Sequence, residues 1–428
     1  MRRDIKVFVG EPPLQVGILR FESNGARSFS SFAYTDEWLS ARDRFAVDPA
    51  LGLFAGSQFP PRTKEGSVFH GAIADSEPDG WGEVVIKRDH NKRRQAAIAA
   101  GQSFTPDFLT KIDYLIGVDD FSRIGALRFQ DESGAFMRAP QPGRRTTPPL
   151  IELGQILAAT RALEADEETA ADLAYLQGRG TSLGGLRPKC TVLDEEGFLS
   201  IGKFPSIADQ RSVTKGEVLA MQLAAKAGIN VAAARLIYSD QTPVSLIRRF
   251  DRTPGGVRIA YISAATMLGV DPEDTPIYHY TDIADSLRQN GAQVNADLEE
   301  LWRRMVFSVL ITNLDDHLRN HGFLHAGAGT WRLSPAFDLN PSPDRVREFK
   351  TWVSEEAGPE ASIANVLSVA SYFRVSSTRA KQIIGACEVA VAQWRTLGRQ
   401  LDMTVPDLDK FARAFEHRER DEARRAAA

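Results

Sequence analysis

A dense cluster of polar residues follows a strongly apolar segment in the last third of the chain. The cluster runs Asn313-Leu-Asp-Asp-His-Leu-Arg-Asn-His-Gly322, and Asp338 follows 18 residues after Asn320. Phosphoryl transfer from a nucleotide needs a carboxylate to take the proton of the attacking hydroxyl. It also needs an amide and a second carboxylate to hold Mg²⁺ against the phosphates. Asp315 fits the first role and Asn320 with Asp338 the second, while Asp316 is predicted to be structural.

The same chemistry requires two further parts upstream of this cluster. A glycine-rich loop must let backbone N–H groups approach the phosphates, and a lysine on a strand must reach them with its charge. Gly184 and Gly185 lie in the glycine-rich segment 178–189, and Lys203 lies near the end of a predicted hairpin, 190–204. This order of parts favours a kinase. The sequence has no G-x-x-x-x-G-K-[ST] motif, which argues against a P-loop NTPase.

The elements that would position these residues can be predicted from periodicity. Residues 5–9 and 15–21 suit two strands, and 83–100 suit a polar helix. The segment 138–149 holds four prolines and is a predicted domain boundary. Apolar residues at helical spacing over 298–310 predict a central helix just ahead of the polar cluster. The sequence therefore predicts an α+β protein with a β-rich first part and a mainly helical second part.

Composition sets the limits of this interpretation. The 428 residues carry 52 Lys and Arg against 56 Asp and Glu, for a net charge of −4, and 43% are hydrophobic. These are globular values, and they exclude a fibrous, disordered or supercharged chain. The near-neutral balance gives no reason to expect the whole molecule to coat nucleic acid or a membrane. Two cysteines, a charged start and no apolar run near 20 residues favour a cytoplasmic protein without a membrane span.

With these residues placed, the sequence resembles the HipA family, the serine/threonine-kinase toxins of bacterial toxin–antitoxin systems. The likeness covers nearly the whole chain and rests on five segments: 75–82 (DSEPDGWG), 182–189 (SLGGLRPK), 246–252 (LIRRFDR), 315–320 (DDHLRN) and 333–339 (LSPAFDL). It implies a two-lobed protein-kinase-like fold. Residues 1–148 would form an added N-terminal subdomain, 149–250 a kinase-like N-lobe, and 251–428 a helical C-lobe.

The resemblance also implies roles for single residues. Asp315 would be catalytic, and Asn320 and Asp338 would be magnesium ligands. The residues expected to bind ATP are Gly184, Gly185, Lys203 and Phe250. Ser182 stands where the family carries a serine that is autophosphorylated, which ejects the phosphate loop and stops the kinase. The cofactors would be ATP and Mg²⁺. The expected partners are a HipB-like antitoxin, through which the protein would meet DNA, and a target protein such as an aminoacyl-tRNA synthetase.

Several alternatives stay open at this point. A small-molecule phosphotransferase would use the same Asp, Asn and Asp logic, and a catalytically inert partner of a transcriptional repressor would keep a vestigial nucleotide site. Glu217 could pair with Lys203, or it could form a capping box with Thr214. Three histidines recur every four residues from His317, but Gly322 interrupts them, so a zinc site is not expected.

Overall fold

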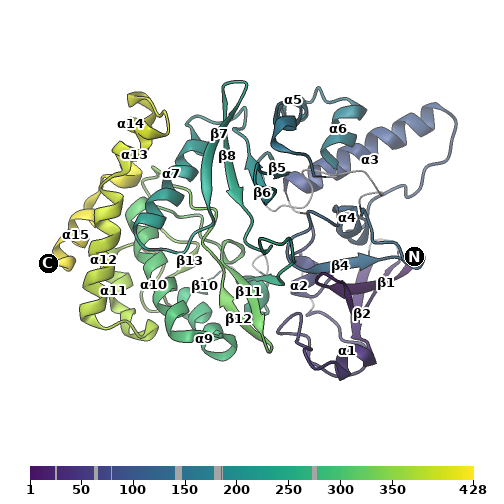
Figure 1. The fold of residues 1–428 in the computed structure, drawn as a ribbon, viewed down its shortest axis with the longest axis horizontal. Coiled ribbons are helices and arrows are strands. Elements are labelled where there is room, and N and C mark those ends of the chain that lie inside the picture. Colours follow the sequence, from purple (N-terminus) through teal and green to yellow (C-terminus); the bar gives the residue numbers. More distant parts are fainter. Residues whose placement is uncertain are drawn as a thin grey trace. The chain divides into compact units, whose positions relative to one another are not determined.

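The computed structural model describes residues 1–24, 27–61, 66–78, 80–139, 147–177, 185, 187–271 and 277–428. The chain forms two compact units (Figure 1). Unit 1 comprises residues 1–208 and 237–262, and unit 2 comprises 209–236 and 263–428. Each unit is therefore built from two separate segments of the chain. The predicted boundaries at 148/149 and 250/251 divide the chain differently and stay a prediction.

The first sheet of unit 1 is antiparallel, in the strand order β3-β2-β1-β4. Alternating apolar residues build it, since Ile5 pairs with Leu19 and Leu19 with Phe32, and all three side chains are buried. The strands expected at 5–9 and 15–21 are thus confirmed, and they are longer than the pattern indicated. Their bounds are β1 Arg2–Val9, β2 Leu14–Asn24, β3 Arg27–Tyr34 and β4 Leu127–Gln130.

The second sheet of unit 1 holds the predicted hairpin, in the order β5-β6-β8-β7. Asp194 closes the hairpin turn by accepting backbone N–H bonds from Glu196 and Phe198. Buried residues of this sheet form one core with three helices, among them Val85, Ile156, Val192 and Val244. The strands are β5 Lys189–Leu193, β6 Leu199–Lys203, β7 Ala234–Ser239 and β8 Thr242–Arg248, and the helices are α3 Trp81–Ala99, α5 Leu153–Glu164 and α6 Ala170–Gln177.

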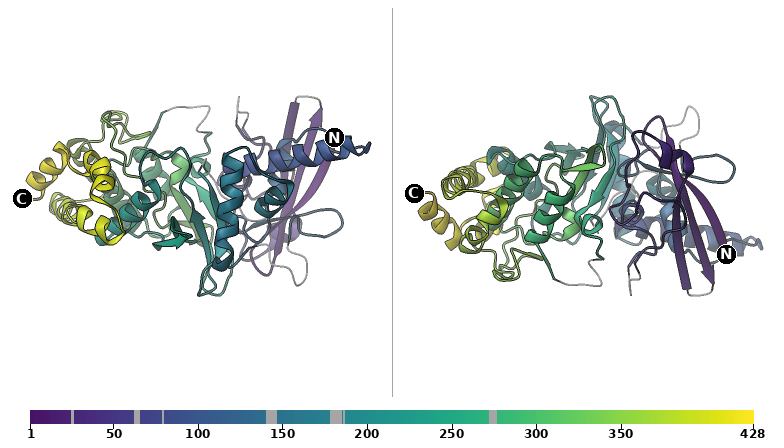
Figure 2. Two further views of the ribbon diagram at one scale, coloured as in Figure 1. Left: turned by 90° about the horizontal axis from the view of Figure 1, so that it is seen from above. Right: turned by 90° about the horizontal axis from the view of Figure 1, so that it is seen from below.

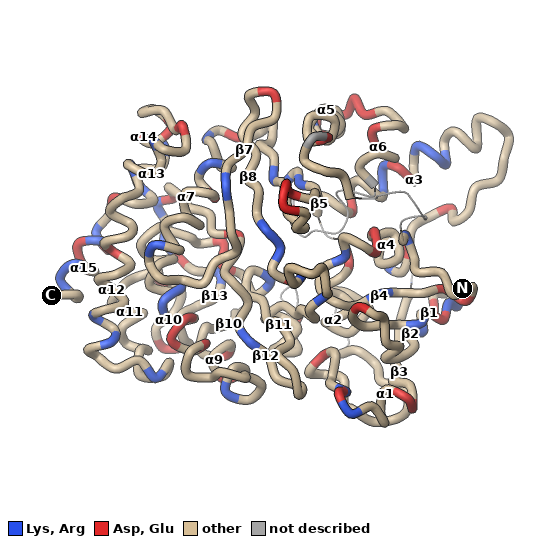
Figure 3. The backbone as a smooth tube through the Cα atoms, in the orientation of Figure 1, with Lys and Arg blue, Asp and Glu red and all other residues tan. Residues whose placement is uncertain are grey.

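Helix α3 carries the densest run of basic side chains, blue in Figure 3. Acidic side chains meet most of these cations. Arg88 pairs with Asp166 at 2.5 Å and with Glu168 at 3.1 Å, and Lys92 lies 3.5 Å from the same Glu168. The helix is therefore a neutralised surface and not a basic face of the kind that binds nucleic acid.

A buried ion network joins the segment 249–252 of unit 1 to residues 121–125 of the same unit. The carboxylate of Asp251 accepts hydrogen bonds from Arg249 Nε at 2.8 Å, Arg252 Nη1 at 2.8 Å and the backbone N–H of Gly125 at 2.7 Å. Burial alone would raise the pKa of Asp251, but the two guanidiniums outweigh it and hold that pKa below its ordinary value. The Arg-Phe-Asp-Arg segment is thus a structural tie within unit 1.

Unit 2 is mainly helical, and its C-terminal helices (yellow in Figure 2) pack on one another. Helix α12 packs against α15, and an ion pair of 2.7 Å between Glu388 and Arg420 joins them. The helices are α7 Val213–Lys226, α8 Ala264–Leu268, α9 Tyr280–Asn290, α10 Val294–Ile311, α11 Ile363–Ser368, α12 Ser377–Val391, α13 Trp394–Gln400, α14 Val405–Phe415 and α15 Arg418–Ala427.

The predicted central helix is α10, which packs against α9 and α12 (Figure 1). Leu298, Trp302 and Met305 are fully buried, and Trp302 Nε1 donates to the carbonyl of Val366 at 2.9 Å. This anchors the helix from which the polar cluster emerges. Short strands follow the cluster: β11 Gly322–Gly327 pairs antiparallel with β12 Thr330–Leu333, and β10 Tyr278–His279 pairs in parallel with β13 Thr351–Trp352.

The α+β class, with a β-rich first part and a helical second part, is confirmed. One of the two alternatives left open for Glu217 is excluded. Helix α7 begins at Val213 after Ser212, so Thr214 lies inside it, and the Thr214 hydroxyl has no hydrogen-bond partner among the described residues. The Thr214–Glu217 capping box therefore does not form. Among the described residues, no helix is long and apolar enough to cross a bilayer.

Candidate active site

The catalytic segment predicted from the sequence begins where α10 ends. Thr312 closes the helix in a left-handed conformation, with φ 54°, and turns the chain out of the core. The segment then runs extended until a 3-10 turn at Leu318–Asn320 folds it back. At that turn Asn320 Nδ2 donates to the backbone carbonyl of Asp315 at 2.7 Å. The spacing of Asp315 and Asn320 is thus the span of one compact loop, and this bond ties its ends together.

Asp338 is joined to the same loop by a chain of amide side chains. Asn340 Nδ2 donates to Asp338 Oδ1 at 3.0 Å, and the Asn340 backbone N–H donates to Asn313 Oδ1 at 3.0 Å. Asn313 is buried at the foot of α10. Asp338 itself has φ 55°, a conformation that non-glycine residues rarely adopt and that costs free energy. Asn313 and Asn340 fix this strained residue to the end of the central helix.

His317 lies beside the Asp315 carboxylate. Its Nε2 is 4.0 Å from Asp315 Oδ1. Burial lowers the pKa of His317; the charges of Asp315 and Asp338 oppose that shift, and those of Lys350 and Arg319 add to it. The charges of Asp315 and Asp338 therefore both act on the pKa of this one imidazole. Asn320 joins this group through its bond to Asp315. Lys350, which the sequence did not single out, completes the group with an ammonium 2.5 Å from Asp315 Oδ1.

Asp316 is a buried anchor, as the sequence predicted for the structural neighbour of Asp315. The hydroxyl of Tyr280 donates to Asp316 Oδ2 at 2.8 Å, and the backbone N–H of Lys350 donates to Oδ1 at 2.9 Å. Thr351 Oγ1 donates to the Asp316 carbonyl at 2.7 Å. The side chain therefore fastens the catalytic loop to α9 and β13. Burial raises the pKa of the Asp316 carboxyl from 3.8 to about 7.

This raised pKa makes stability depend on pH. The folded protein holds the Asp316 proton more tightly than the unfolded chain does, so the stabilisation is complete below pH 3.8 and is lost as pH rises through about 7. We expect Asp316→Asn to remove this loss, since an amide can accept the two backbone N–H bonds and donate to Tyr280. Between about pH 5 and about pH 8 the wild type should lose about 2 to 3 kcal/mol relative to the variant.

Urea denaturation at the two pH values measures this difference. Glu355→Gln, which changes an exposed carboxylate of unit 2 to an amide, is the matched control and should follow the wild type. Parallel pH curves for wild type and Asp316→Asn would show that Asp316 does not titrate in this range.

The three regularly spaced histidines do not converge. His321 is buried in contact with the Tyr280 ring, and burial lowers its pKa to about 3, whereas His325 lies in β11 beside Trp331. Within the part of the chain that the structure describes, no group of three or more His, Cys, Asp or Glu side chains could hold a metal ion. A divalent ion at Asn320 and Asp338 needs fewer protein ligands, because Mg²⁺ is commonly held by one or two side chains plus substrate phosphates.

The residues present fit such an ion. Asn320 commits its amide nitrogen to the Asp315 carbonyl, which leaves the amide oxygen as the donor for a cation. Asp338 supplies a carboxylate whose Oδ1 is oriented by Asn340. Both donors are hard oxygens, the ligand type that Mg²⁺ prefers. No pattern in the sequence singled out Asn340 as a supporting residue.

Unit 1 carries the lysine and part of the glycine loop. Lys203 on β6 stands opposite Lys189 on β5 in the antiparallel register, so the two side chains leave the same face. Gly185 has φ 90°, a conformation that residues with a Cβ rarely adopt, so the backbone here favours glycine. The Gly185 carbonyl accepts the backbone N–H of Trp81 at 3.0 Å, which joins the loop to the start of α3. Ser182 and Gly184 lie outside the described residues.

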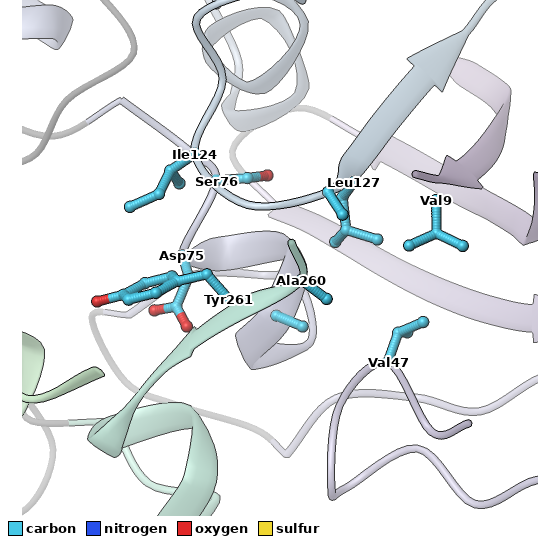
Figure 4. Close-up of a pocket in the computed structure, with 10 residues that line it drawn as sticks. Val9, Val47, Asp75, Ser76, Ile124, Leu127, Ala260 and Tyr261 are labelled. Carbon is cyan, nitrogen blue, oxygen red and sulfur yellow. The ribbon is translucent and has the colours of Figure 1, made fainter. Parts of the chain in front are cut away.

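Phe250, the remaining predicted ATP contact, lies 6.2 Å from Tyr261 between ring centroids, in unit 1. A small cavity of about 10 Å³ lies nearby, lined by Asp75, Ser76 and Tyr261 among others (Figure 4). That volume holds about one water molecule, so the cavity is not a nucleotide site. Burial and then the Asp75 charge raise the pKa of Tyr261 well above its ordinary value. The Asp75–Gly82 motif therefore begins at the lining of this small cavity.

Comparisons with known proteins identify the family and the fold. Residues 181–394, half of the chain, match the HipA-like C-terminal domain. The chain is 27% identical over 326 residues to the "Putative kinase Y4mE" of Sinorhizobium fredii, which covers 72% of this chain and 71% of that protein. It is 32% identical over 152 residues to the "Putative kinase Y4dM" of the same organism, covering 32% of this chain and 36% of that protein.

One solved structure matches the fold over nearly the full length. It is a chain of the Shewanella oneidensis MR-1 toxin–antitoxin complex of HipA, HipB and operator DNA, with a TM-score of 0.65 and 14% sequence identity. The match covers 99% of this chain and 96% of that chain. At this identity the likeness establishes the fold: α+β and protein-kinase-like, with an added N-terminal subdomain and a mainly helical C-terminal lobe.

Proposed function

The chain belongs to the HipA-like C-terminal domain family, and from this premise we propose that it is an ATP-dependent protein serine/threonine kinase. It transfers the γ-phosphate of ATP to a hydroxyl of a target protein and to its own Ser182. The observation that carries the proposal is the loop in which Asn320 binds the backbone of Asp315 while Asp338 and Asp315 act on one histidine. A phosphotransferase needs its proton acceptor and its two metal ligands in one such group.

Each residue has a defined task in the proposed reaction. Asp315 orients the attacking hydroxyl and takes its proton. Asn320 and Asp338 hold Mg²⁺, which neutralises charge on the phosphates when it is bound. Gly184 and Gly185 offer backbone N–H groups, Lys203 contributes a cation, and Phe250 contributes to ATP binding. Catalysis then rests on positioning and electrostatic stabilisation. Lys189, paired with Lys203 in the sheet, supplies a second cation to the same phosphates.

The proposed partners follow from the assembly in which the structural match was found. That complex contains HipA, HipB and operator DNA. We therefore propose that a HipB-like antitoxin neutralises this kinase in the cytoplasm and that DNA is reached mainly through the antitoxin. An aminoacyl-tRNA synthetase is the proposed class of target. The three-part organisation, 1–148, 149–250 and 251–428, is retained within this proposal.

Incubation with Mg²⁺ and ATP labelled at the γ-phosphate tests the function, followed by intact-mass measurement of the protein. One added phosphate is expected on the wild type and none on Ser182→Ala, while Ser133→Ala, at an exposed turn, keeps it. A labelled protein should appear when cell extract is added. Label found on small molecules alone would favour a small-molecule phosphotransferase. ATP binding without turnover would favour an inert partner of a repressor.

A further inference from the structure

Lys350 places a cation on the carboxylate that is proposed to accept the proton. Its ammonium lies 2.5 Å from Asp315 Oδ1, and the two side chains are 60% and 54% exposed. An ion pair between exposed groups contributes about 0 to 1 kcal/mol to stability. A contribution to stability therefore does not account for this contact. The exposed ammonium of Lys350 can exchange Asp315 for another acceptor.

The backbone of Lys350 is held far more firmly than its side chain. The N–H of Lys350 donates to the buried Asp316 Oδ1 at 2.9 Å, and the next residue, Thr351, pairs with Tyr278 in the β10–β13 sheet. Tyr280 fixes the other oxygen of Asp316 at 2.8 Å. The root of the lysine is thus preset beside the catalytic loop, while its exposed end can move between neighbouring oxygen atoms.

The surrounding charges place this ammonium among the reacting groups. Lys350 acts on His317 together with Asp315 and Asp338, so it shares their environment. Burial is the largest cause that lowers the pKa of His317. Within the described residues Lys350 is then a cation that directly contacts the Asp315 carboxylate. A phosphoryl group brought next to Asp315 would carry more negative charge than one carboxylate. It would therefore compete with Asp315 for the Lys350 ammonium.

We propose that Lys350 is a further catalytic residue, whose ammonium moves from Asp315 to the oxygen atoms of the transferring phosphoryl group. The inference rests on the proposed function. In the step, the hydroxyl oxygen forms a bond to the γ-phosphorus and the bond from that phosphorus to the bridging oxygen breaks. Its electron pair leaves with ADP, the hydroxyl proton passes to Asp315, and Lys350 stays protonated. Departure of the ammonium frees the carboxylate to take that proton only when the phosphoryl group is present.

Self-phosphorylation of the full chain with Mg²⁺ and ATP tests this role, measured as the rate at saturating ATP and the ATP concentration for half-maximal rate. Lys350→Met should lower the saturated rate about 100-fold and leave the half-saturating ATP concentration within about threefold. Lys350→Arg keeps the charge and should recover at least about a tenth of the rate. Lys381→Met, at an exposed lysine of α12, is the matched control and should behave as the wild type.

The outcomes separate this inference from the function on which it rests. Absence of transfer by the wild type would overturn both. An active wild type with an unchanged rate in Lys350→Met would overturn the catalytic role alone, and a faster rate would make the lysine an inhibitory lock instead. Thermal melting by circular dichroism accompanies each rate. If Lys350→Met melts at a lower temperature than the wild type, its rate cannot be interpreted and Lys350→Arg becomes the deciding variant. A folded Lys350→Arg protein whose rate falls as far as that of Lys350→Met would contradict the catalytic role.

Discussion

Asp315→Asn should reduce transfer of the ATP γ-phosphate by about 10²- to 10⁴-fold, which is the range that a positioned general base contributes. The amide keeps the shape of the side chain and can still accept a hydrogen bond from Lys350, but it cannot take the proton of the attacking hydroxyl. Because the Asp315 side chain is 54% exposed, its loss of charge should leave folding intact. The initial rate of phosphate transfer and the thermal melting curve together measure both expectations.

Asp421→Asn is the matched control for this substitution, since it removes an exposed carboxylate in α15 of the same unit. It should retain the wild-type rate. Full activity in Asp315→Asn would reject Asp315 as the base. A parallel loss of rate and of melting temperature would show that the residue supports the loop rather than the chemistry.

Asp251→Ala should lower the free energy of unfolding by about 3 to 5 kcal/mol, the cost of removing one partner from a buried ion pair. The substitution leaves Arg249 and Arg252, both largely buried, without their carboxylate. It also removes the acceptor of the Gly125 N–H. Since the pKa of Asp251 is held low, the stabilisation it gives is present above the ordinary aspartate pKa and is lost as pH falls.

A neighbouring arginine gives the control for this experiment. Arg248 pairs with Asp194 at 3.1 Å and Glu196 at 2.8 Å, but its side chain is 36% exposed. Arg248→Ala should therefore cost about 1 kcal/mol or less. Chemical denaturation followed by circular dichroism compares the two variants with the wild type. Equal losses of unfolding free energy in the two variants would show that the buried network stabilises the protein no more than the surface ion pairs do.

Much of the fold was predictable because local patterns carried it. Short apolar segments over residues 5–9 and 15–21 are typical of strands, and the turn at Asp194–Gly197 favours pairing of the two strands that flank it. The apolar stripe of α10 was equally clear, since Leu298, Leu301 and Met305 recur at helical spacing and are buried. These features depend on residues that are close in the sequence, so they can be predicted without knowledge of tertiary contacts.

The catalytic segment was predictable in part, for a different reason. The chemistry limits the residue types, and one loop accounts for the spacing of Asp315 and Asn320. Lys350 could not be identified from the sequence, because it lies in an irregular stretch. Its position beside Asp315 depends on the pairing of β13 with β10, which the sequence does not reveal. Asp251 looked like a motif residue. Its role as an ion-network centre depends on Gly125, which is 126 residues away in the sequence.

The capping-box alternative for Glu217 is excluded because α7 begins at Val213, with Ser212 as its N-cap residue. Ser212 and Thr214 are both residues that favour the N-terminus of a helix, and a pattern of Thr followed by Glu at the third position could not separate them. The observed helix takes the earlier start, with its N-cap two residues before Thr214, so Thr214 lies in its first turn.

The interleaving of the two units has a consequence for synthesis on the ribosome. Unit 1 needs residues 237–262, which emerge only after residues 209–236 of unit 2. The β6–β8 pairing and the Asp251 network are therefore impossible while only the first 208 residues have left the exit tunnel. A nascent chain must keep the exposed edge of β6 unpaired over that interval, at a translation rate of about 5 to 20 residues per second. Chaperone demand should peak during those seconds.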